Sequence, residues 1–104
     1  MDPGVGPRKT IRHHHEPGHW HEFTFSCHQR RPLLVDDQFR EVLSRCIDQA
    51  NHACGVRLVA FVYMPEHVHL LTYPLAANPN IGQYLAGIKQ PASTRIKRLL
   101  EARK

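Results

Sequence analysis

The sequence is short of cysteine and contains no long apolar run. Its three cysteines, Cys27, Cys46 and Cys54, are odd in number and form no Cys-x-x-Cys pair, which argues against a disulfide scaffold or a zinc ribbon. We interpret them as buried thiols in a reducing compartment. No stretch approaches the roughly 20 apolar residues of a membrane span, and the N-terminus lacks the apolar core of a signal peptide. We therefore expect a cytoplasmic protein without a membrane segment.

Acidic residues are also few. Nine Asp and Glu stand against 14 Lys and Arg, which gives a formal net charge of +5. This balance favours polyanionic partners such as nucleic acid, although a merely soluble basic protein would have the same charge. The length of 104 residues allows one domain at most, and an apolar share of 41% permits a modest core.

The first residues differ in composition from the rest. Residues 1–18 contain three prolines and three glycines, so we expect a flexible arm ahead of a domain over residues 19–104. Arg8, Lys9 and Arg12 make this arm basic and a candidate contact for a DNA backbone. A tail without any role is the alternative interpretation.

Apolar patterning predicts a strand and then a helix in the first half of the domain. Residues 19–27 alternate as a strand, with the aromatic residues Phe23 and Phe25 on one face. A helix then begins at Asp36, whose side chain can cap it, and carries an apolar stripe. It ends at Gly55, since glycine is the preferred residue just after a helix.

The second half is predicted to contain two strands and a helix. Residues 56–63 are apolar at nearly every position, which favours a strand buried on both faces. The next strand, residues 67–73, is expected to pair antiparallel with it. Asn80 can cap a second helix, which Pro91 should kink or break. The order β-α-β-β-α is typical of an α+β, ferredoxin-like fold without its last strand.

Two histidines lie two residues apart in the strand predicted over residues 67–73. Because side chains at i and i+2 of a strand point to the same face, His67 and His69 should project together. A neutral imidazole is a good ligand for divalent metals, so the pair supplies half of a metal site. The same spacing occurs at positions 13 and 15 and at 19 and 21, in the polar N-terminal quarter. The alternative is a pair of half-buried strand residues bonded to backbone groups.

The octet Met64–Leu71, with the sequence MPEHVHLL, resembles the HUH signature (His, hydrophobic residue, His) of the single-tyrosine transposases. It is most similar to that of the IS200/IS605-like enzymes and the REP-associated tyrosine transposases. Residues 23–34 resemble the first strand and basic turn of this family, and residues 80–89 resemble the helix after its motif strand. The resemblance implies an antiparallel sheet with helices packed on one face and the histidines facing away from them.

The resemblance also implies a function. The family binds single-stranded or hairpin DNA and cleaves and rejoins strands through a phosphotyrosine. It implies that His67 and His69 hold Mg²⁺ or Mn²⁺ together with one further polar ligand. The enzymes act as dimers, so a homodimer or a mixed dimer with a full-length relative is expected.

The nucleophilic tyrosine of the family is not matched in this sequence. In the family it lies on a later helix, in a Tyr-Ile-x-x-Asn-Pro-Val context that is missing here. We expect packing roles for Tyr63, Tyr73 and Tyr84, with Tyr73 as the fallback nucleophile because it shares a strand face with the histidines. The chain therefore resembles a transposase domain truncated at its C-terminus, before the tyrosine helix, and inactive alone.

Clustered basic side chains are candidates for contact with DNA phosphates, which give affinity without sequence information. They are Arg30, Arg31, Lys89, Arg95, Lys97 and Arg98. Two other functions stay open. One is a domesticated remnant that binds DNA hairpins without catalysis, and the other is a metal-binding protein unrelated to DNA.

Overall fold

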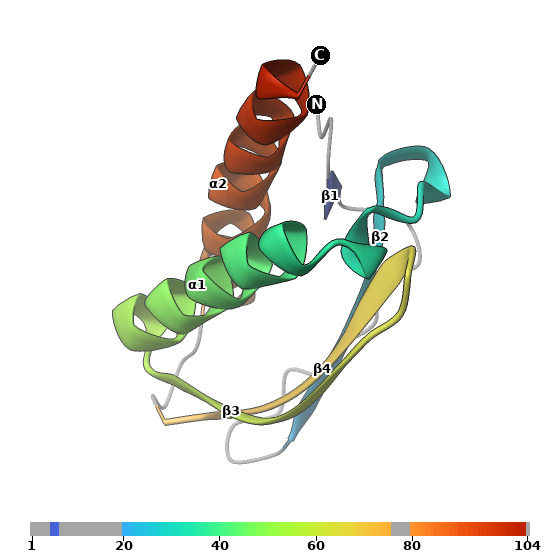
Figure 1. The fold of residues 1–104 in the computed structure, drawn as a ribbon. Helices are drawn as coiled ribbons and strands as arrows, with labels where there is room; N and C mark the ends of the chain where they lie inside the picture. Colours follow the sequence, from blue (N-terminus) through green and yellow to red (C-terminus); the bar gives the residue numbers. More distant parts are fainter. Residues whose placement is uncertain (1–4, 7–19, 76–79, 104) are drawn as a thin grey trace.

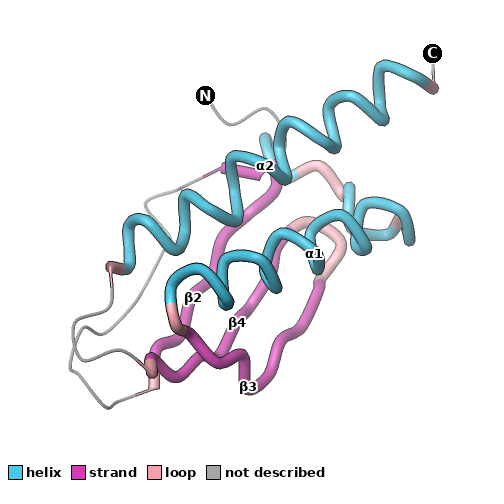
Figure 2. The backbone as a smooth tube through the Cα atoms, turned by 90° about the vertical axis from the view of Figure 1, so that its left-hand side faces the viewer, coloured by secondary structure: helices cyan, strands magenta, loops and turns pink. Residues whose placement is uncertain are grey.

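The computed structural model describes residues 5–6, 20–75 and 80–103. Two helices cover one face of an antiparallel sheet, and they lie side by side across its strands (Figures 1 and 2). The sheet has the strand order β1-β2-β4-β3. The elements are β1 (Val5–Gly6), β2 (His21–Cys27), α1 (Asp37–Cys54), β3 (Val56–Tyr63), β4 (His67–Pro74) and α2 (Ile81–Ala102), with short 3-10 turns at His28–Arg30 and Leu33–Val35.

The predicted α+β class and the order β-α-β-β-α are confirmed by the elements from β2 to α2. The structure adds β1, which the sequence did not predict. Its residues Val5 and Gly6 pair with Cys27 and Ser26 at the outer edge of β2. The other residues of the expected N-terminal arm lie outside the described residues, so its flexibility stays a prediction.

The core lies between the helices and one face of the sheet. Phe23 and Phe25 on β2 and Val68 and Leu70 on β4 are all at most 1% exposed. They meet the apolar stripes of both helices, and burying each large side chain contributes about 1.5–3 kcal/mol. Intervening residues of β4 are only half-buried, so the strand has one core face and one open face.

The cysteines are free thiols. Cys27 and Cys46 are buried, as expected, whereas Cys54 at the end of α1 is only half-buried. Burial raises the pKa of the Cys46 thiol, although the nearby Arg95 guanidinium opposes the shift. In the described part of the chain, no helix is long and apolar enough to cross a membrane.

Strand β3 differs from its prediction. It was expected to be buried on both faces, but Val59, Phe61 and Val62 are 43%, 50% and 53% exposed. The prediction is wrong because, among the strands that the structure describes, β3 pairs with β4 alone and forms the edge of the sheet. Its register also shifts between Leu58 and Ala60, as happens at a β-bulge, a common feature of edge strands. A continuous apolar run cannot by itself distinguish a central strand from an edge strand.

The helix ends agree with the sequence. The Asp36 carboxylate accepts hydrogen bonds from the backbone N–H of Gln38 (2.8 Å) and of Phe39 (3.3 Å), so it caps α1. Gly55 follows α1 with φ 65°, a left-handed conformation that favours glycine. Asn80 caps α2 by accepting from the N–H of Gln83 at 2.9 Å.

Helix α2 runs through Pro91 without interruption, as the tube in Figure 2 shows. The expectation of a break there is wrong. Pro91 removes one intrahelical hydrogen bond, but the residues around it are anchored in the core. Ile88, Ala92 and Ile96 are completely buried on the side of α2 that packs against the rest of the domain. Tertiary packing thus offsets the local cost of the proline.

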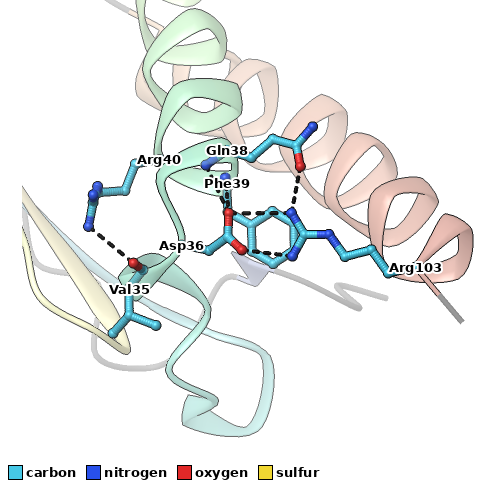
Figure 3. A network of polar contacts seen from close by, with 6 residues as sticks. All are labelled: Val35, Asp36, Gln38, Phe39, Arg40 and Arg103. Carbon is cyan, nitrogen blue, oxygen red and sulfur yellow. Dashed lines mark hydrogen bonds and ion pairs between the residues drawn. The ribbon is translucent and has the colours of Figure 1, made fainter.

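A polar network joins the C-terminal end of α2 to the start of α1 (Figure 3). The Arg103 guanidinium donates to Asp36 Oδ2 at 2.7 Å and to Gln38 Oε1 at 2.5 Å, and it lies 4.6 Å from the centre of the Phe39 ring. The hydrogen bond from Arg103 lowers the pKa of the Asp36 carboxyl, and the capping N–H groups lower it further. One carboxylate thereby caps α1 and holds α2.

Candidate functional site on the open face of the sheet

The face of the sheet turned away from α1 and α2 carries the histidines; we call it the open face. Directly paired residues of antiparallel strands point to the same side, so the register defines rows across this face. Read from β2 through β4 to β3, the rows are Ser26–His67, Thr24–His69–Val62, Glu22–Leu71–Ala60 and, at the far end, Tyr73–Arg57.

His67 and His69 lie together on β4 and are half-buried. Their Nε2 atoms are 3.1 Å apart, and the ring planes meet at 75°. The predicted geometry is thus confirmed: both rings project from the same side of an antiparallel sheet. Since β2 and β3 flank β4 on either side, the backbone beneath the pair is held in two ladders.

Each ring has a polar neighbour behind it. Thr24 Oγ1 lies 3.1 Å from His69 Nδ1, within hydrogen-bond distance. The Glu66 carboxylate lies 3.6 Å from His67 Nδ1, a buried atom that has no hydrogen-bond partner among the described residues. Histidines that bind metal through one ring nitrogen commonly donate the other N–H to such groups, which set the tautomer and the ring orientation. The sequence analysis singled out neither Thr24 nor Glu66. Thr24 could not be identified from the sequence, because only the strand register brings it beside His69.

The histidine pair fits the requirements of a divalent cation. Two nitrogen atoms bound to one ion at about 2.1 Å lie about 3.0 Å apart at neighbouring octahedral positions and about 3.4 Å apart at tetrahedral ones. The observed 3.1 Å agrees with a shared ion. Among the described residues no group of three or more His, Cys, Asp and Glu forms a metal cluster. Water or a phosphate oxygen would complete the coordination, as is common for Mg²⁺.

The tyrosines are positioned differently from one another. The hydroxyl of Tyr63 is hydrogen-bonded to Ser44 on α1 at 2.7 Å, and burial raises the pKa of this phenol. The hydroxyl of Tyr84 donates to Asn51 at 2.7 Å, and burial raises its pKa strongly. Tyr73 lies on the open face, four residues from His69, or about 13 Å along the strand. Its ring contacts Trp20 edge-on, with the ring centroids 5.6 Å apart.

Five of the six basic residues predicted to contact DNA fall into two groups. Arg30 and Arg31 are exposed in the turn after β2, at the end of the sheet that carries His67. The N–H of Leu34, just past this turn, donates to Pro65 at 3.0 Å, next to the histidine motif. Arg95 and Arg98 instead line a groove between the two helices, on the other side of the sheet, and Lys97 is exposed on the same helix.

Lys89 corrects the predicted set. Its side chain is 3% exposed, and its ammonium group lies 5.3 Å from the centre of the Phe25 ring inside the core. A buried ammonium group cannot reach a DNA phosphate, so the prediction for Lys89 is wrong. A lysine can lay its hydrocarbon chain along an apolar surface such as the core-facing side of α2. The periodicity of the sequence alone therefore could not show whether Lys89 is buried or exposed.

A match to a protein-family model identifies the family of this chain. The family model described as "Transposase IS200 like" matches residues 12–104, nearly the whole chain. The chain belongs to the IS200-like transposase family. A comparison with curated proteins finds no significant match.

Two solved structures resemble this transposase domain. One is a REP-associated tyrosine transposase bound to a REP hairpin, with a TM-score of 0.70 and 20% sequence identity; the match covers 86% of this chain and 54% of that chain. The other is a candidate transposase from Deinococcus radiodurans R1, with a TM-score of 0.58 and 22% identity; the match covers 93% and 69%. At these identities the likeness shows a shared fold. The transposase domain spans about half the length of the first of these proteins.

Proposed function

We propose that this transposase domain binds single-stranded or hairpin DNA across its open face, with one phosphodiester held at His67 and His69 through a divalent cation, Mg²⁺ or Mn²⁺. The observation that supports this most is the 3.1 Å separation of the two Nε2 atoms on a face that the helices leave uncovered. Such a cation neutralises charge that develops on the phosphate during strand cleavage.

The residues of the domain would hold this arrangement as follows. For His69 to offer its Nε2 lone pair, its ring must carry the proton on Nδ1 and donate it to Thr24 Oγ1. His67 would direct its Nδ1 proton toward the Glu66 carboxylate. Arg30 and Arg31 would attract the DNA backbone at the same end of the sheet. The two ladders of β4 limit movement of the histidines while the DNA binds.

Cleavage and rejoining need a nucleophile near the histidines. Tyr63 and Tyr84 are engaged on the helix side of the sheet, and Tyr73 lies at the far end of β4. We therefore propose that the domain alone binds DNA without cutting it. In a homodimer both copies would lack this tyrosine, so the activity would need a mixed dimer with a full-length relative that supplies it. The site of action would be cytoplasmic.

The runner-up is a hairpin-binding remnant without any catalytic role. The placement of the tyrosines favours it as much as it favours the mixed dimer. The metal-binding protein unrelated to DNA is the third candidate. Binding of DNA would reject the metal-binding protein unrelated to DNA. A test of whether a full-length relative restores cleavage would distinguish the transposase subunit from the hairpin-binding remnant.

The first experiment measures binding of a labelled hairpin and a labelled single strand at low and high salt. We expect affinity that falls steeply with salt, because each neutralised phosphate releases a counterion. The double variant Arg30→Gln, Arg31→Gln should bind more weakly than Arg95→Gln, Arg98→Gln, which makes the same charge change behind the sheet. Equal affinity at both salt concentrations, or no binding at low salt, would reject DNA as the partner.

The second experiment tests cleavage. The protein is incubated with labelled single-stranded DNA and Mn²⁺ and examined on a denaturing gel for a covalent adduct. We expect no labelled protein band from this chain alone, and a band once a full-length relative is added. A band from the chain alone that vanishes in Tyr73→Phe would show that Tyr73 is the nucleophile and that the domain is active.

A further inference from the structure

An exposed aromatic pair occupies the end of the open face opposite to Arg30 and Arg31. Trp20 is 52% exposed, an unusual state for the largest apolar side chain, and it meets the half-buried Tyr73 edge-on. Arg57, also exposed, pairs with Tyr73 from the neighbouring strand β3. We call Trp20, Tyr73 and Arg57 the aromatic row. Neither the cation site nor the basic turn makes use of it.

We propose that the aromatic row is a stacking site for an unpaired nucleobase of the DNA strand whose phosphate lies at the histidine pair. The inference rests on the proposed function and adds a specific contact to it. Surfaces that bind single-stranded nucleic acid combine aromatic side chains, on which bases stack, with cationic side chains that follow the backbone. The aromatic row contains both kinds of side chain.

The position of the row supports a base of the same strand as its ligand. Tyr73 and His69 are on one strand and one face, about 13 Å apart, so a single DNA strand can reach both. The row between them contains the uncharged Leu71 and Ala60, with Glu22 at its β2 end, so a strand can pass without meeting a negative charge on the β4 and β3 side of the row. The surface is thus continuous from the cation site to the aromatic row.

Charged side chains on the two sides of the open face also determine the path that a DNA strand would take. Glu22 is exposed on the β2 side of the intervening row and would repel a phosphate there. Arg57 on the β3 side would attract one. The backbone would therefore pass over β3 while the base turns toward Tyr73 and Trp20. Such a division between phosphate and base contacts is usual in nucleic-acid recognition.

The aromatic row is held by the framework beneath it. Tyr73 is followed by Pro74, which is buried and pairs with Val56. The next N–H, that of Leu75, donates to the Gly55 carbonyl at 2.8 Å. The backbone that carries Tyr73 is therefore already ordered before a base stacks on the ring, which favours binding.

The experiment uses Trp20 itself as the probe, because it is the only tryptophan in the sequence. Its emission is recorded while an unlabelled single-stranded oligonucleotide is added to the intact chain. Binding is followed in parallel by the anisotropy of a labelled copy of the same oligonucleotide. We expect saturable quenching of the emission with the same midpoint as the anisotropy. An oligonucleotide with abasic positions flanking the bound phosphate should bind more weakly and quench less.

Substitutions of Trp20 test whether its aromatic ring, rather than any exposed apolar side chain, accounts for DNA binding. Trp20→Ala should weaken oligonucleotide binding roughly 5- to 150-fold, the range for loss of one base–aromatic contact, whereas Trp20→Phe should retain most of it. Val35→Ala is the matched control, because Val35 is an exposed apolar residue at 63% in the turn before α1. It should leave binding unchanged. Circular dichroism checks that every variant is folded.

The outcomes distinguish this inference from the function on which it rests. DNA binding by anisotropy without quenching, and with Trp20→Ala equal to the wild type, would overturn the stacking site and leave the proposed function standing. Absence of any DNA binding would overturn both. A change of Trp20 emission with protein concentration alone would assign the row to contact between copies of the chain, and it would also overturn the inference.

Discussion

The two faces of the sheet are built from alternate residues of the same strands, but they serve different purposes. On β4, Val68 and Leu70 are 1% exposed beneath the helices, whereas His67, His69 and Tyr73 are half-buried on the open face. Because strand side chains alternate with a period of two, one segment can anchor the core and carry the site. The core face holds the backbone in place, and the open face presents polar groups where water can reach them.

The contrast has a physical reason. Imidazole nitrogens placed beneath the helices would lose their contact with water and would need hydrogen-bond partners there, since unpaired buried polar groups are costly. On the open face, His69 Nδ1 lies within hydrogen-bond distance of Thr24 and the two Nε2 atoms face each other, while His67 Nδ1 is buried 3.6 Å from the Glu66 carboxylate. The arrangement leaves the pair available for a ligand without weakening the core.

The largest expected effect is on the free energy of unfolding, and two neighbouring leucines of β4, one on each face, test it. Leu70→Ala should lower the free energy of unfolding by about 2–5 kcal/mol, because it leaves a cavity under the helices. Leu71→Ala, on the open face, should cost about 1 kcal/mol or less. Denaturant unfolding of both variants measures the difference. Similar losses would show that the open face is also packed, against a partner or another segment.

The next effect concerns the histidine pair. His67→Ala or His69→Ala should weaken Mn²⁺ binding by more than the roughly 10- to 100-fold that the loss of an outer partner costs, while stability stays near that of the wild type. Titration calorimetry or the spin resonance of Mn²⁺ gives the affinity. His52→Ala, at an exposed position on α1, is the control. Unchanged Mn²⁺ affinity in both open-face variants would reject the cation site.

A smaller effect on Mn²⁺ affinity is expected from substitution of Thr24, the polar neighbour of His69. Thr24→Val keeps the shape of the side chain but removes the acceptor for the Nδ1 proton of His69, so Mn²⁺ affinity should fall by about 10- to 100-fold. Thr24→Ser restores the hydroxyl and should recover most of the affinity. If the serine variant were as weak as the valine variant, packing of the β2 strand rather than the hydrogen bond would explain the loss.

The smallest expected effect is on the helix layer. The Asp36 carboxyl has a folded pKa below its usual 3.8, so its contribution to stability is present above that pH and is lost as the pH falls through the folded pKa. Arg103→Gln should therefore be slightly less stable than wild type at neutral pH, and the difference should shrink below pH 3.8. Lys97→Gln makes the same charge change on α2 and is the control. A difference that is independent of pH would exclude the Asp36–Arg103 contact as its cause.

Local signals in the sequence predicted much of this fold. Asp36 and Asn80 cap their helices, and Gly55 ends α1, because these depend on a few neighbouring atoms. The spacing of His67 and His69 predicted their shared face for the same reason. Where the outcome depends on distant segments, local signals failed. Pro91 lies inside a continuous helix because the core holds the turns on both sides of it.

Local sequence signals were enough to predict the order of elements from β2 to α2, the helix caps and the period-two pattern that separates the faces of β4, but not the strand β1 or the continuity of α2. The predicted features follow from backbone geometry and from short-range hydrogen bonds. Contacts between distant segments make β3 the exposed edge, bury Lys89 over Phe25 and bring Thr24 beside His69. They also place Trp20 against Tyr73. Strand order and register arise from the packing of the whole sheet under two helices, and no single segment contains that information.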